Sequence, residues 1–129
     1  MEKKKYDLED RLIDFAVLVI KIAEKIGNTV AGKHLGENLI RSGTSPALNY
    51  GEAQGAESHK DFIHKMKICL KELRETRVGL KIINKLPFEQ VKSLLDEALP
   101  ENEELISIFF KSIETAQSNL RTKSKNELN

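Results

Sequence analysis

The sequence of 129 residues contains no tryptophan, one cysteine, three prolines and seven glycines. Its single cysteine, Cys69, excludes a disulfide within the chain and is typical of a reducing compartment, so we expect a cytoplasmic protein. Aromatic residues make up only 5% of the chain, which leaves few side chains for an aromatic cofactor or carbohydrate platform. The longest apolar run, 15–20, is far shorter than the ~20 residues that span a bilayer, so we expect no membrane segment.

Helical periodicity dominates the sequence because so few prolines and glycines interrupt it. A chain of this length predicts one domain over residues 1–129. The first predicted helix covers 7–26 and ends at Gly27. Its apolar band is broad enough to contact two neighbours, which are either two helices of its own bundle or one helix and a second subunit.

The second predicted helix covers 29–56 and has a seam of small and polar residues in its second half. Pro46 lacks an amide donor and predicts a kink or break near 43–45. Small residues let a neighbouring backbone approach closely. Tight helix packing is therefore the favoured interpretation, and a ligand-contacting surface is the alternative.

The third predicted helix opens at Ser58 and ends at Leu86 and Pro87. It has the most regular apolar seam of the chain, formed by Phe62, Met66, Cys69, Leu73, Thr76, Leu80 and Ile83. A short extra helix is expected over 88–99, followed by a last long helix that begins at Pro100. The pattern predicts an all-α, antiparallel, up-down-up-down four-helix bundle with its core at 7–120 and a polar, frayed tail at 121–129.

The formal net charge of +1 argues against a strongly basic nucleic-acid coat protein. The near-neutral total, however, is a cancellation between neighbouring segments. Residues 57–86 hold eight basic and four acidic side chains, whereas residues 87–120 hold two basic and seven acidic ones. The third helix is therefore the positively charged element of the chain.

Basic side chains follow the third helix at the spacing of its apolar seam, offset by two residues. This basic stripe consists of Lys60, His64, Lys67, Lys71, Arg74, Lys81 and Lys85. The offset corresponds to about 200° around a helix and predicts that the stripe lies opposite the core. Three interpretations stay open: a solvated face neutralised in part by acidic residues on the same helix, a contact for nucleic acid, or a contact for an acidic surface such as 87–120 of another subunit.

No constellation of residues predicts a reaction. Asp61 and His64 have the spacing used in di-metal bundles, but such sites need a second motif of this kind and two further carboxylates. The three histidines are scattered, and one cysteine cannot complete a zinc site. The glycines match no phosphate-binding loop. We therefore expect no enzyme activity, metal, cofactor or small-molecule substrate.

Polar residues do form one constellation across the second and third helices: Asn49, Glu52, Lys71, Glu72 and Glu75. Antiparallel pairing across the turn at 56–58 places the first two near residues 64–65. The same pairing places Lys71 and Glu75 opposite 42–45. A network that fixes the register or a subunit contact is the favoured interpretation, and a ligand or RNA site is the alternative.

The run IRSGTSPALNYGEA at 40–53, continued by 54–65 and by LKELRET at 70–76, resembles a bacterial family. The family comprises small four-helix-bundle proteins labelled 23S ribosomal RNA intervening-sequence proteins, and the resemblance covers about 7–120. The chain departs from the family pattern at 46–48 and at Gly51. The positions that match the motif are Arg41, Ser42, Ser45, Asn49, Glu52, Asp61, Lys71, Glu72 and Glu75.

This resemblance implies a ring-like homo-oligomer, a pentamer, and brings no catalytic residues with it. It also implies a relation to a branch that assists the reverse transcriptase of diversity-generating retroelements and contacts nucleic acid. We therefore expect a non-enzymatic bundle that binds RNA or a nucleoprotein through the basic stripe. The alternative is a protein-interaction module whose third helix docks an acidic partner or a neighbouring subunit.

Overall fold

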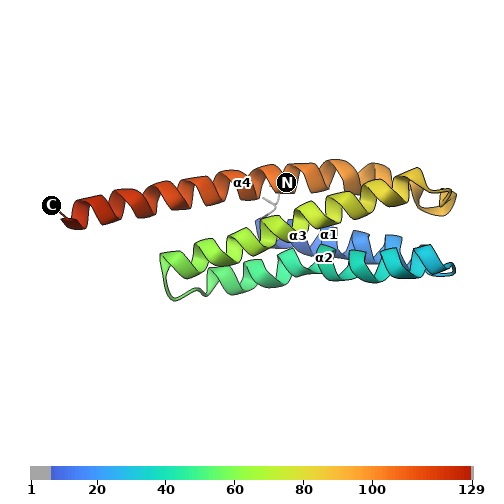
Figure 1. Cartoon of the computed structure of the whole chain (residues 1–129), viewed down its shortest axis with the longest axis horizontal. Coiled ribbons are helices and arrows are strands. Elements are labelled where there is room, and N and C mark those ends of the chain that lie inside the picture. The colour runs from blue at the N-terminus through green and yellow to red at the C-terminus, as the bar shows by residue number, and fades with distance from the viewer. Residues whose placement is uncertain (1–6, 129) are drawn as a thin grey trace, which may run out of the picture.

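The computed structural model of the chain describes residues 7–128, and its regular structure there is entirely helical (Figure 1). Four helices turn back on one another at alternate ends and pack as an antiparallel bundle, which confirms the predicted fold class. A single 3-10 turn, η1, separates the last two helices. The elements are α1 (Leu8–Lys25), α2 (Val30–Gln54), α3 (His59–Lys85), η1 (Glu89–Val91) and α4 (Lys92–Leu128).

Side-chain caps set the first residues of three helices. Asp7 accepts a hydrogen bond from the Asp10 amide at 2.8 Å at the start of α1. Thr29 caps α2 and Ser58 caps α3 in the same way, so the predicted start of the third helix is confirmed. These caps satisfy amide donors that have no partner within the helix, and they hold the short turns between helices in place.

The core is a continuous apolar cluster to which all four helices contribute. The seam predicted on the third helix is buried from Met66 to Ile83, and only its first member, Phe62, is half-buried. Residues such as Phe15 on α1 and Phe109 on α4 fill the space opposite this seam. The predicted heptad pattern therefore identified the face of α3 that the other helices cover.

The second helix runs without interruption through Gly43 and Pro46, so it is not broken at 43–45. Pro46 costs the helix one amide donor but is itself buried against the neighbouring helices. Gly43 packs against Val19 of α1, and a Cβ at Gly43 would lie 2.5 Å from Val19 Cγ1. Packing against α1 and α3 thus keeps α2 in one piece, which favours the packing interpretation of its small residues.

Three predictions about the last third of the chain are wrong. The short extra helix expected over 88–99 is only the 3-10 turn at 89–91, and α4 passes through Pro100 in its interior instead of beginning there. The frayed tail expected at 121–129 is helical as far as residue 128, while residue 129 lies outside the described residues. Buried side chains explain the corrections at 88–99 and at Pro100, because one apolar face continues across Pro100 through Leu95, Ala98, Leu105 and Phe109.

The helices differ in length, so fewer helices lie side by side at one end of the bundle. Helix α1 has 18 residues and α4 has 37, which correspond to about 27 Å and 55 Å. Figure 1 shows α1 beside only one half of the bundle, while the end of α4 extends past the turn between α2 and α3. Within residues 7–128, no helix has an apolar stretch long enough to cross a membrane.

Candidate nucleic-acid interface

All seven residues of the basic stripe lie on α3 with exposed side chains. None of its six lysines and arginines forms an ion pair with any described residue. The middle of the stripe borders α4, because Lys67, Lys71 and Arg74 line a groove between α3 and α4.

The acidic residues expected to neutralise the stripe face a different helix. Glu72 and Glu75 of α3 both pair with Arg41 of α2, and the Arg41 Nη1 to Glu72 Oε2 distance is 3.1 Å. The hydrogen bond to Glu75 is the main cause that raises the pKa of the Arg41 guanidinium. Because these carboxylates turn toward α2, the positive charge of the stripe is left without internal partners along α3.

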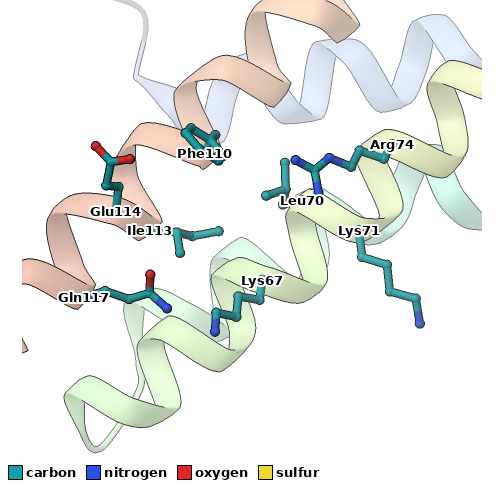
Figure 2. A pocket seen from close by; sticks show the side chains of 8 residues that line it. All are labelled: Lys67, Leu70, Lys71, Arg74, Phe110, Ile113, Glu114 and Gln117. Atoms are coloured by element: carbon teal, nitrogen blue, oxygen red, sulfur yellow. The ribbon is translucent and has the colours of Figure 1, made fainter.

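The groove between α3 and α4 has a volume of about 440 Å³. We call it the α3–α4 groove, and its lining residues are Lys67, Leu70, Lys71 and Arg74 of α3 and Phe110, Ile113, Glu114 and Gln117 of α4. Figure 2 shows Leu70 and Ile113 between the two helices, where they form an apolar floor. The groove thus has an apolar floor and a basic wall on the α3 side.

The polar side chains of the α3–α4 groove point in different directions. In Figure 2, Arg74 extends from α3 toward α4, and Lys67 lies near Gln117. Lys71 and Glu114 point away from the gap on opposite sides. Phe110 is 51% exposed at the groove. An exposed phenyl ring next to unpaired cations is an arrangement that sequence reasoning missed, because periodicity did not show which apolar residues of the last helix remain uncovered.

The predicted polar constellation joins α2 and α3 in the expected register. Lys65 Nζ lies 3.7 Å from Glu52 Oε2, and Glu75 meets Arg41 one residue before the 42–45 segment. Lys71 does not belong to this network, because it lies on the α3–α4 groove away from α2. The network therefore links two helices of one chain, in agreement with the register interpretation.

Hydroxyl groups continue the network into the core. Ser42 and Thr76 are buried, and their oxygens lie 3.0 Å apart. Thr76 Oγ1 also lies 2.8 Å from the Glu72 carbonyl oxygen. A hydroxyl has one proton, so when Thr76 donates to that carbonyl, Ser42 donates to Thr76. Asn49 bonds within its own helix, to the carbonyl and hydroxyl of Ser45, and does not contact residues 64–65.

A second groove, between α1 and α4, is acidic. Arg11 Nη2 lies 2.6 Å from Glu101 Oε1 and 3.2 Å from Glu104 Oε1, and the hydrogen bond to Glu101 raises the pKa of the Arg11 guanidinium. Asp14 and Glu97 also line this groove, whose volume is about 580 Å³. The negative charge of the last segment was predicted from the sequence, but its ion pairs with the first helix were not.

The remaining groups that the sequence raised are the candidates for metal binding and thiol chemistry. Among residues 7–128, no group of three or more His, Cys, Asp or Glu side chains is placed to hold a metal ion. Asp61 serves the α3 cap through its amide and shares no ion pair with a described residue. Cys69 is buried, and burial raises the pKa of its thiol to about 12, which suppresses the reactive thiolate.

These features define a small antiparallel helical bundle whose most developed candidate site is a charged helix face bordering an open groove. The chain belongs to the family described as 23S rRNA-intervening sequence protein, whose model matches residues 4–111. A 1.70 Å crystal structure of a protein with unknown function from the S23 ribosomal protein family of Bacteroides thetaiotaomicron VPI-5482 is similar in fold. The two chains are 27% identical with a TM-score of 0.71, over 83% of this chain and 98% of the other.

A search of curated proteins gave no match. The family resemblance that the motif at 40–76 predicted is confirmed by the match over residues 4–111. The relation to retroelement accessory proteins stays a prediction.

Proposed function

We propose that the protein is a non-enzymatic, homo-oligomeric helical bundle of the cytoplasm that binds RNA through the basic stripe on α3. One observation carries this proposal: six lysines and arginines are exposed on one helix and have no ion pair with a described residue. The family name refers to 23S ribosomal RNA, so we propose RNA and not another polyanion as the ligand. We propose a pentamer because the family resemblance implies one.

The geometry of α3 suits a polyanion that extends along the helix. The stripe runs from Lys60 to Lys85, roughly 37 Å at 1.5 Å per residue. Phosphates of a nucleic acid repeat much more closely than this, so several can be neutralised at once. Each neutralised phosphate releases a counterion, and affinity then falls as salt rises.

Binding of a structured 23S ribosomal RNA fragment at several salt concentrations tests the proposal. The variant carries Lys67→Gln, Lys71→Gln and Arg74→Gln, which remove three charges from the middle of the stripe. We expect weaker binding and a log–log salt slope that is shallower by about 2–3, at 0.7–0.9 per phosphate contact. A retroelement RNA serves as a second probe for the predicted relation to accessory proteins.

A matched control removes three charges elsewhere. Lys21, Lys33 and Lys111 are exposed on α1, α2 and α4, and a triple glutamine variant at these positions changes the net charge equally. We expect it to bind RNA nearly as well as the natural chain. Equal loss in both triple variants, or no loss in the stripe variant, would refute binding through the stripe.

An acidic partner for the stripe is the second candidate, and the acidic groove between α1 and α4 favours it. Glu97, Glu101 and Glu104 line this groove, with Arg11 as its basic residue. A neighbouring subunit that offers this groove would pair with α3. In that case the stripe variant changes the sedimenting mass and leaves RNA affinity unchanged. Sedimentation with and without RNA therefore separates the two candidates and reports the oligomeric state.

A further inference from the structure

We propose that the α3–α4 groove holds a single-stranded segment of RNA, with one unpaired base stacked on Phe110 and the phosphate backbone following α3. This inference rests on the proposed function, because it specifies which form of RNA the middle of the basic stripe binds. It assigns the recognition of an unpaired base to α4, a helix outside the stripe.

Phe110 provides the stacking surface. It is the only phenylalanine or tyrosine among residues 7–128 that is exposed, since the other described phenylalanines and Tyr50 are buried or half-buried. Leu70 and Ile113 line the same groove and are themselves buried. An exposed ring above an apolar floor offers a flat face to a base, and stacking on such a face tolerates any base.

Cations stand along the opposite wall of the groove. Lys67 and Arg74 line it from α3, about 10 Å apart along the helix, and Lys71 lies between them on the outer side. Arg74 extends toward α4, where its planar guanidinium can contact a phosphate or the face of a base. None of the three shares an ion pair with a described residue, so all three are available to phosphates.

The charge of the groove differs between its two walls and orients the strand. The residues that line the groove from α4 include no cation: Gln117 is neutral, and the Glu114 carboxylate points away from the gap. The cations of the groove all lie on α3, so the backbone follows α3 and the base faces α4. Gln117 has an amide that can donate to and accept from a base edge, and it lies close to Lys67 in Figure 2.

The groove selects a single strand over a duplex because a base must leave the stack to reach Phe110. In a duplex, the faces of the bases are covered by their neighbours, and A-form RNA presents mainly its backbone and shallow minor groove. A volume of about 440 Å³ lies within the range of sites that take a small ligand. It can therefore admit an unpaired base but not a helix of paired strands.

Fluorescence anisotropy with a labelled ten-nucleotide oligouridine and a hairpin duplex of the same charge tests this proposal. The variant Phe110→Leu keeps an apolar side chain and removes the aromatic face. We expect it to bind the oligouridine about tenfold more weakly and the hairpin with unchanged affinity. Its salt slope should stay the same because no phosphate contact is lost.

Two further variants make the result specific. Phe110→Tyr keeps the aromatic ring and should bind the oligouridine within about twofold of the natural chain. Leu48→Ala shortens another exposed apolar side chain, on α2, and should change neither affinity. Irradiation at 254 nm followed by mass spectrometry should find the crosslinked base on the peptide that contains Phe110.

The outcomes distinguish this inference from the proposed function. If Phe110→Leu leaves oligouridine binding unchanged while the stripe variant weakens it, the stripe binds RNA but the single-strand site is refuted. If the stripe variant binds both RNAs unchanged, the proposed function itself fails. If Phe110→Leu changes the sedimenting mass and not the RNA affinity, a second copy of the chain covers the groove and the inference is overturned.

Discussion

Replacing Gly43 with alanine tests whether the motif on α2 serves packing. Gly43 lies in the interior of α2, where it is buried against α1. An added Cβ would lie 2.5 Å from Val19 Cγ1 and 3.0 Å from Val19 Cβ. Val19 is fully buried and β-branched, so its side chain cannot rotate away at low cost.

Two opposing terms determine the effect of Gly43→Ala on stability. Forcing a methyl group into a packed interface costs about 1–3 kcal/mol. Alanine also favours the helix over glycine by about 0.8–1 kcal/mol. We therefore expect the free energy of unfolding to fall by about 0–2 kcal/mol, which by itself is a broad range.

Gly51→Ala supplies the control that isolates the packing term. Gly51 is exposed on the same helix, and a Cβ there would meet nothing within 4 Å. It should gain only the helix term, about 0.8–1 kcal/mol. The difference between the two variants is then the packing cost alone, about 1–3 kcal/mol.

Urea unfolding at one fixed protein concentration measures both variants, since association shifts apparent stability. Val19→Ala in the Gly43→Ala background removes both γ-methyl groups that the added Cβ would meet, so the two substitutions should couple favourably. Equal stabilisation by Gly43→Ala and Gly51→Ala would refute the close approach of α1 and α2. The alternative interpretation, that the small residues of the motif form a ligand-contacting surface, would then be favoured.

Two further predictions concern buried groups. Burial raises the pKa of the Cys69 thiol to about 12. At pH 8, the thiol should therefore react with a thiol reagent roughly a thousandfold more slowly in the folded chain than in urea. The rate in the folded chain should increase as the pH rises. Equal rates in the two states would contradict its burial. Thr76→Val should lower the free energy of unfolding by about 1–2 kcal/mol because the buried Ser42 hydroxyl loses its acceptor, and adding Ser42→Ala should restore part of the loss. A double variant less stable than Thr76→Val would show that the two hydroxyls do not pair.

Local patterns in the sequence were sufficient for most of the fold. The seam on α3, the cap at Ser58 and the register between α2 and α3 all depend on residues close together in the chain or on a short turn. Periodicity determines which face of a helix is apolar, and that face must be covered. The motif at 40–76 likewise predicted the family correctly.

The last helix shows where local rules fail. A proline is tolerated best in the first turn, so Pro100 predicted a helix start. In the structure, Leu95 and Ala98 before it and Leu105 after it are all fully buried. The free energy gained by burying them on one continuous helix outweighs the lost amide donor, and only the neighbouring helices determine that gain.

The candidate site likewise has features that the local sequence predicts and features that depend on packing between helices. The basic stripe and its order could be predicted from the sequence, because helical geometry alone places side chains with this spacing along one side of α3. The packing of the helices was needed to show that Glu72 and Glu75 turn to Arg41, that the stripe borders a groove with α4, and that Phe110 stays uncovered there. These features depend on which helix lies beside which face, and that choice is made by packing between residues far apart in the chain.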